Sequence, residues 1–144
     1  MFKTIQAIQT PQAPKAIGPY SQAVSLNLTQ SNQALNQSLN QLVFLSGQIP
    51  LDPEMGELIT GDFKERVRQV FKNLEAVCQA AGAVDLNKIV KLTIFLTDLS
   101  NINFQILNQV MQEFFTAPYP ARSTIQVAGL PKGTDIEIEG ILAL

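Results

Sequence analysis

Arg122, Glu137 and Glu139 are the residues of this chain whose types and spacing could do chemistry. Arg122 follows the proline-bracketed run PYP at residues 118–120, and the two glutamates alternate with isoleucines. An arginine presents a planar fork of donors that binds a carboxylate at two points, and a glutamate held in a pocket can act as a general base toward water. The pattern predicts a pocket for a small carboxylate. The alternatives are a structural ion pair for Arg122 and a solvated strand face for the glutamates.

Two turns offer further polar atoms for such a pocket. The run GPYSQ at residues 18–22 presents the hydroxyl of Tyr20. The run SGQ at residues 46–48 ends an apolar stretch, where an exposed backbone N–H group can bind an anion. Both features are common in proteins, so the residues alone predict a carboxylate-binding pocket and do not name a reaction.

The residue inventory argues against several chemistries. The chain has no histidine and one cysteine, Cys78, so it lacks the usual parts of a nucleophilic triad, a histidine metal site or an intrachain disulfide. Cys78 falls in a periodic apolar run and is expected in the core. The net charge of −2 provides no basic stripe for a phosphate backbone. We therefore expect neither a metal site nor a nucleic-acid partner.

Length and composition predict a single domain over residues 1–144. Apolar residues make up 46% of the chain and charged residues 15%, which indicates additional buried surface between subunits; a lightly charged monomer is the alternative. The first residues contain no apolar stretch of signal-peptide length, and no run approaches the ~20 apolar residues that cross a bilayer. A cytoplasmic protein without a membrane partner is expected.

Two apolar stripes at helical spacing predict the helices that must position these residues. The first covers residues 63–81, with Asp62 and Glu65 as a capping box and Gly82 as a left-handed end. The second follows a Ser100 cap and must end before the proline at position 118. Its apolar positions are Phe104, Leu107, Val110, Met111 and Phe114.

Apolar runs of a different kind predict the strands. Residues 89–96 are almost continuously apolar, which is typical of an inner strand, and residues 136–144 alternate, with Glu137 and Glu139 on one face. Further strands are expected at residues 42–46, 3–8, 23–28 and 124–127. The order of elements predicts an α+β fold with both helices packed on one face of a mixed β-sheet. The other face would need cover, which again indicates subunit packing.

The segment of residues 28–41 departs from ordinary globular composition. The dipeptide Asn-Gln recurs at positions 32, 36 and 40, and the segment carries no charge. Because Asn and Ser are poor helix-interior residues, we expect a flexible or partly helical loop insertion between two strands. The alternative is a partner site in this loop.

Four ordered runs resemble the signature blocks of the RidA family, the YjgF-like reactive-intermediate deaminases. They are IGPYSQA at residues 17–23, SGQIP at 46–50, PARST at 120–124, and LPKG at 130–133 with IEIE at 136–139. The resemblance covers nearly the whole chain apart from residues 28–41. It implies a chorismate-mutase-like fold and a homotrimer, with the sheets lining a central β-barrel and three clefts between subunits.

The same resemblance implies an activity and a set of site residues. The activity is hydrolysis of 2-iminobutanoate and 2-iminopropanoate to 2-oxoacids and ammonia, with no cofactor of the enzyme's own. Arg122 would bind the substrate carboxylate and Glu137 would position the attacking water. The other implied cleft residues are Tyr20, Ser46, Gly47 and Asn108. Thr124 stands where some members have cysteine, so thiol chemistry is absent there. A protonated imine is already electrophilic and needs only orientation and a base for water.

Two other functions fit the resemblance. One is a regulatory protein that binds a 2-oxoacid without turnover. The other is an endoribonuclease or translation inhibitor, which the acidic balance and the lack of histidine disfavour. The presence of both Arg122 and Glu137 favours the enzyme. The stretch between Tyr20 and Ser46 is longer than the hairpin usual in the family, so it could cover or crowd the cleft mouth.

Overall fold

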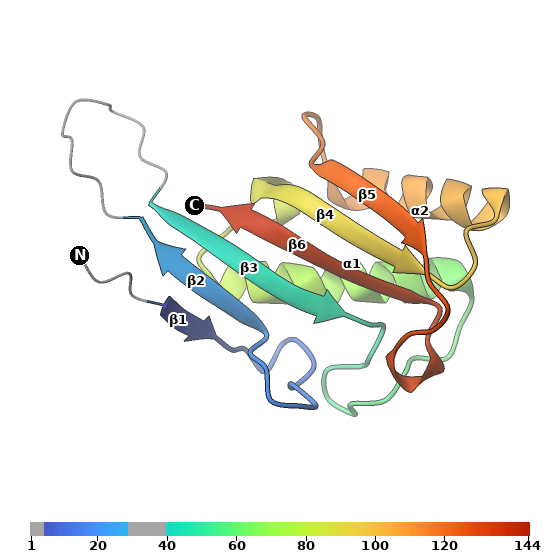
Figure 1. Ribbon diagram of the computed structural model, residues 1–144, viewed down its shortest axis with the longest axis horizontal. Coiled ribbons are helices and arrows are strands. Elements are labelled where there is room, and N and C mark those ends of the chain that lie inside the picture. Colours follow the sequence, from blue (N-terminus) through green and yellow to red (C-terminus); the bar gives the residue numbers. More distant parts are fainter. Residues whose placement is uncertain (1–4, 29–39) are drawn as a thin grey trace.

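A mixed sheet is the framework that carries the candidate residues (Figure 1). The structure is a computed structural model that describes residues 5–28 and 40–144. Within these residues six strands form one sheet in the order β1-β2-β3-β6-β4-β5. Strands β4 and β5 pair in parallel and the other neighbours are antiparallel, so the predicted mixed sheet is confirmed. The strands are β1 (Ile5–Ile8), β2 (Ala23–Asn27), β3 (Gln41–Gln48), β4 (Ile89–Leu96), β5 (Ala121–Gln126) and β6 (Ile136–Ala143).

Two helices, α1 (Phe63–Ala80) and α2 (Asn101–Phe114), cover one face of this sheet (Figure 1). The capping box predicted for α1 is confirmed, because Asp62 accepts the backbone N–H of Glu65 and the Glu65 carboxylate accepts that of Asp62. Gly82 follows the helix with a φ of +108°, as expected for its end. None of the helices within residues 5–28 and 40–144 is long and apolar enough to span a bilayer.

Helix α2 begins as predicted but turns one of its apolar residues away from the core. Ser100 caps it by accepting a first-turn backbone N–H group. Leu107, Val110 and Met111 are buried against the sheet, whereas Phe104 stays 37% exposed. Phe104 is therefore the member of the predicted apolar stripe that lies outside the core, and its ring contacts a charged side chain described below.

The hydrophobic core lies between the two helices and the sheet face that they cover. It contains the buried side chains of β4 and β6, which alternate with less buried residues along each strand. The alternation was predicted for β6. Strand β4 is an inner strand, between β6 and β5. Cys78 is fully buried in this core, and burial raises the pKa of its thiol to about 12, so it packs as a small apolar residue.

Strand β5 starts three residues earlier than predicted. Its pairing with β4 runs from Lys91–Ala121 to Leu96–Gln126, directly after Pro120. Residues 121–123 are weak strand formers by themselves, and pairing with an inner strand outweighs that preference. The earlier start brings Arg122 into the sheet, where its side-chain direction is fixed by register.

The second sheet face is partly apolar, and no helix within residues 5–28 and 40–144 covers it. Its exposed residues include Ile5, Phe44 and Ile125, with Phe44 at 46% and Ile125 at 44% exposure. These exposed aromatic and β-branched side chains, on β1, β3 and β5, give the face apolar surface that favours burial against another protein chain.

The segment of residues 28–41 falls mostly outside the described part of the chain, since residues 29–39 are not described. Its described ends, Leu28 and Asn40, are joined by a backbone hydrogen bond of 2.8 Å from Leu28 N–H to the Asn40 carbonyl. Strand β3 then carries the chain about 20 Å to its other end, where Ser46 lies. Both ends therefore lie at the far end of the β2–β3 hairpin from Ser46 (Figure 1).

Candidate active site

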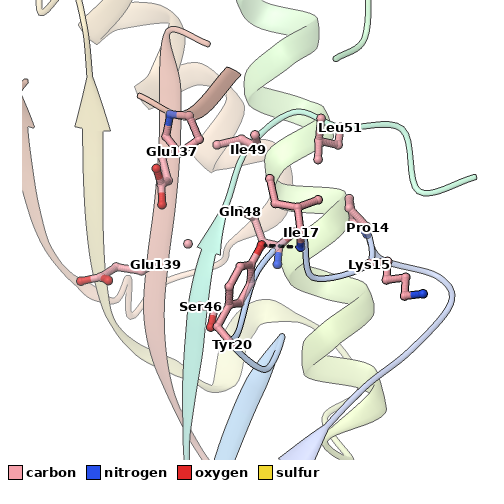
Figure 2. Close-up of a pocket in the computed structure, with 12 residues that line it drawn as sticks. Pro14, Lys15, Ile17, Tyr20, Ser46, Gln48, Ile49, Leu51, Glu137 and Glu139 are labelled. Atoms are coloured by element: carbon pink, nitrogen blue, oxygen red, sulfur yellow. Dashed lines mark hydrogen bonds between the residues drawn. The ribbon is translucent and has the colours of Figure 1, made fainter. Parts of the chain in front are cut away.

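A cavity of about 400 Å³ opens where β3 ends and β6 begins. Four of the predicted site residues line it, namely Tyr20, Ser46, Gly47 and Glu137, together with Glu139. We call this the acidic cavity. Figure 2 shows both glutamates on the β6 side and Tyr20 on the side of the N-terminal loop, with Ser46 between them. Its apolar wall consists of Pro14, Ile17, Ile49, Leu51 and Pro131.

The close approach of β3 and β6 explains why a glycine occupies position 47. The pairing of the two strands shifts register between Leu45 and Gln48, which is a β-bulge. At this point the Glu137 side chain packs directly against the Gly47 backbone. A Cβ atom on residue 47 would lie 2.8 Å from the carboxyl carbon of Glu137 and closer still to Oε1. Gly47 therefore provides the space that the Glu137 carboxylate occupies.

Burial and a neighbouring charge alter the acidity of Glu137. Burial raises the pKa of this carboxyl, and the negative charge of Glu139 raises the pKa further. The two residues point to the same face because they lie two positions apart on β6. A carboxylate with a raised pKa in a cavity is suited to accept a proton from water.

The N-terminal loop closes the acidic cavity through a network of hydrogen bonds. The Tyr20 hydroxyl accepts the backbone N–H of Ile17 at 3.2 Å, and the Ser46 hydroxyl donates to the Ser21 carbonyl at 2.6 Å. The buried side-chain amide of Gln22 binds the backbone of Thr10, Ala13 and Pro14. These bonds hold the loop against β3, so the position of Tyr20 is fixed by backbone contacts.

A second cavity, of about 390 Å³, holds the other two predicted site residues, Arg122 and Asn108. We call this the arginine cavity. Nη1 of Arg122 donates to Oδ1 of Asn108 at 2.8 Å and contacts Sδ of Met111 at 3.1 Å. The guanidinium carbon lies 5.3 Å from the centre of the Phe104 ring. Burial lowers the pKa of Arg122 relative to that of a solvated arginine. The guanidinium nevertheless stays charged at neutral pH.

The two cavities lie on opposite faces of the sheet. Arg122 pairs with Leu92, which is buried under the helices, whereas Glu137 pairs with Phe95 on the other face. The register also separates the two residues by two strands and three positions, which is about 10 Å in each direction. One copy of the chain therefore brings together Tyr20, Ser46, Gly47 and Glu137, and separately Arg122 and Asn108.

Arg122 differs from the other two arginines of the chain in its partners. Arg66 binds Asp135, and Arg68 binds Glu113, each through a close ion pair. Both ion pairs lie at the protein surface, where the two arginine side chains remain partly exposed. Among the described residues no carboxylate pairs with Arg122, so the structural ion pair considered for it is not formed there.

The sequence did not single out Phe104 and Met111 as neighbours of the arginine. A signal was present, because Phe104, Asn108 and Met111 are spaced at i, i+4 and i+7 and so share one helix face. Thr124 points to the same sheet face as Arg122, two positions further along β5, and its buried hydroxyl has no hydrogen-bond partner among the described residues. Within residues 5–28 and 40–144, no group of three or more His, Cys, Asp or Glu residues is placed to hold a metal ion.

Comparison with known proteins found a matching family model, similar sequences and similar solved structures. The family model described as Endoribonuclease L-PSP matches residues 10–144. The RutC family protein y4sK of Sinorhizobium fredii is 43% identical, with 97% of this chain and 98% of that protein covered. The 2-iminobutanoate/2-iminopropanoate deaminase of Dermatophagoides farinae is 42% identical, with 95% and 94% covered. The crystal structure of RidA from an Antarctic Psychrobacter has a TM-score of 0.79 and 44% identity, with 96% of this chain and 99% of that chain covered.

Proposed function

Because this chain belongs to the RidA family of YjgF-like proteins, we propose that it is an imine deaminase. Its substrates are 2-iminobutanoate and 2-iminopropanoate, and its products are the matching 2-oxoacids and ammonia. The proposal rests mainly on the lack of a carboxylate partner for Arg122 among the described residues. Both other arginines have such a partner. A partly buried guanidinium that lines a cavity favours a carboxylate ligand.

The complete site is proposed to form between subunits of a homotrimer. The acidic cavity of one subunit faces the arginine cavity of its neighbour, so that Glu137 and Arg122 act on one substrate molecule. This arrangement agrees with their separation on opposite faces of the sheet in one copy of the chain. It also agrees with the exposed apolar residues of the open sheet face, such as Phe44, which trimer formation would bury.

The reaction follows from the residues of the two cavities. Arg122 holds the substrate carboxylate and thereby places the imine carbon near Glu137. Glu137 accepts a proton from water while the water oxygen bonds to the carbon of the protonated imine, whose nitrogen becomes a neutral amine. Glu137 then returns this proton to the nitrogen of the carbinolamine. The C–N bond breaks and the nitrogen leaves as ammonia, while the hydroxyl oxygen becomes the carbonyl of the 2-oxoacid and its proton passes to the Glu137 carboxylate.

The direct test of this proposal measures capture of the released imine. Threonine dehydratase releases 2-iminobutanoate from threonine, and semicarbazide captures this imine as a semicarbazone. The rate of semicarbazone formation should fall as this protein is titrated in. No change at stoichiometric amounts would contradict the deaminase and favour a protein that binds 2-oxoacids without turnover.

Arg122→Ala should lower kcat/KM by about 100-fold or more, because the substrate loses its charged anchor. The trimer should persist, which light scattering after gel filtration would measure. Arg68→Ala is the matched control, since Arg68 pairs with Glu113 on the helix surface. Wild-type turnover in Arg122→Ala would contradict the role of this residue.

A further inference from the structure

Three residues on one face of α2 contact the guanidinium of Arg122. Phe104, Asn108 and Met111 follow each other at steps of four and three residues, so they form a continuous strip along the helix. Asn108 and Met111 both contact Nη1 of Arg122, at 2.8 Å and 3.1 Å. The Phe104 ring lies against the guanidinium with 5.3 Å between the guanidinium carbon and the ring centre.

These contacts leave a defined edge of the guanidinium for a ligand. Its Nη1 group is occupied, whereas Nε and Nη2 donate to no acceptor among residues 5–28 and 40–144. An arginine can bind a carboxylate through two parallel hydrogen bonds from Nε and Nη2. The geometry of the arginine cavity therefore favours a carboxylate bound on that edge.

A single hydrogen bond to Asn108 does not fix the direction of that edge. The guanidinium could rotate about the line from Nη1 to Asn108 Oδ1, and a thioether sulfur such as that of Met111 is only a weak acceptor. An aromatic ring in contact with the guanidinium restricts this rotation and attracts the positive charge. Phe104 is also free of the core, since it stays 37% exposed, whereas Leu107, Val110 and Met111 of the same helix are buried.

We propose that Phe104 is a positioning residue, whose ring holds the Arg122 guanidinium so that its Nε and Nη2 edge faces the substrate carboxylate. This inference rests on the proposed function only in taking a carboxylate as the ligand of Arg122. Phe104 would thus contribute to substrate recognition by orienting Arg122, without itself contacting the reacting atoms.

The test observes Arg122 directly by NMR. The chain has three arginines, so the spectrum of arginine Nε–H groups contains few signals, and the Arg122 signal is the one that disappears in Arg122→Lys. Arg66 and Arg68, held in ion pairs, serve as internal references. The probe is 2-oxobutanoate, a stable 2-oxoacid, added to wild type, Phe104→Leu and Phe104→Tyr.

In the wild type, 2-oxobutanoate should shift the Arg122 signal and leave the two references unchanged. Phe104→Leu keeps an apolar side chain but removes the ring, so the dissociation constant should rise about three- to tenfold. The Arg122 signal should also lose its ring-current shift. Phe104→Tyr keeps the ring and should restore both. In the deaminase assay, Phe104→Leu should raise KM and largely retain kcat.

Other outcomes separate the failure of this inference from failure of the proposed function. Unchanged affinity and an unchanged Arg122 signal in Phe104→Leu would overturn the positioning role even if the enzyme is active. If 2-oxobutanoate shifts no arginine signal in the wild type, the proposed carboxylate site is wrong and the positioning role is overturned with it. If 2-oxobutanoate binds but no imine is hydrolysed, only the proposed reaction fails. Ile102→Ala, at an exposed position on another face of α2, is the matched control for helix stability.

Discussion

At the scale of single residues, the two glutamates of the acidic cavity have different roles. Glu137 packs against the Gly47 backbone and is partly buried, whereas Glu139 is exposed at the cavity edge. Removing a carboxylate from water disfavours its charged form, and a second negative charge nearby adds to this effect. Glu139 therefore raises the pKa of Glu137, the proposed base, without taking part in the reaction itself.

Glu139→Gln should move the acid limb of the pH profile of kcat/KM to lower pH. The pKa of Glu137 is raised by burial and by Glu139, so activity is lost as pH falls through that raised pKa and the base becomes protonated. Removing the charge of Glu139 lowers the pKa of Glu137, while burial still holds it above the ordinary range. An acid limb that stays in place would show that Glu137 does not limit the reaction there. Glu75→Gln, on α1 behind the other sheet face, should leave the profile unchanged.

Gly47→Ala should disturb the acidic cavity through a single methyl group. Its Cβ would overlap the Glu137 carboxyl, so that side chain must move out of position. We expect a loss of kcat/KM of about 100-fold and a loss of stability of about 1–3 kcal/mol. Gly129→Ala is the control, because a Cβ there meets no atom within 4 Å. Full activity in Gly47→Ala would show that Glu137 needs no fixed position.

At the scale of elements, α1 supports the cavity through one buried polar residue. Asn73 is 1% exposed, and its Nδ2 donates to the carbonyl groups of Ile49 and Leu51 at 3.2 and 3.0 Å. Both of these residues belong to the apolar wall of the acidic cavity. The helix thus holds the turn after β3, in which Leu51 N–H donates to the Ile49 carbonyl at 2.7 Å, by satisfying two of its carbonyl groups.

Asn73→Asp should destabilise the fold by about 2–4 kcal/mol, because it replaces a donor with a carboxylate facing two carbonyl groups. Urea unfolding followed by circular dichroism would measure this. Lys72→Ala, at the exposed neighbouring position, should change stability by less than about 0.5 kcal/mol. Equal stability of Asn73→Asp and the wild type would show that residues 49–51 do not depend on these two hydrogen bonds.

At the scale of the whole molecule, the placement of the two cavities on opposite sheet faces predicts that subunits share their active sites. Arg122→Ala retains Glu137, and Glu137→Gln retains Arg122. Each variant alone should lose nearly all of its activity, since each of its sites lacks one group. In mixed trimers formed from both variants, some sites receive Glu137 from one subunit and Arg122 from the next.

Co-expression of these two variants in equal amounts should restore about a quarter of wild-type activity, because about one site in four then receives both intact groups. The deaminase assay on the purified mixture would measure this. A mixture of Arg122→Ala with the double variant should stay inactive and is the control. No recovery in the first mixture, with mixed trimers demonstrated by mass spectrometry, would contradict a site shared between subunits.

The amino-acid sequence by itself determined the elements and the residues of interest. Helix spacing and capping residues predicted α1 and α2, and apolar runs predicted β4 and the alternating strand β6, because these signals depend on neighbours within a few residues. The four motif runs predicted the family, which the comparisons confirmed.

Only the tertiary structure decided how those residues are grouped. The insertion of β6 between β3 and β4 is a long-range pairing, and its register sets Glu137 on one face and Arg122 on the other. A shift of one residue in either strand would reverse a side chain's face, and no local pattern specifies that pairing. The contact of Gly47 with Glu137 likewise joins residues far apart in the chain, so it exists only once the sheet has formed.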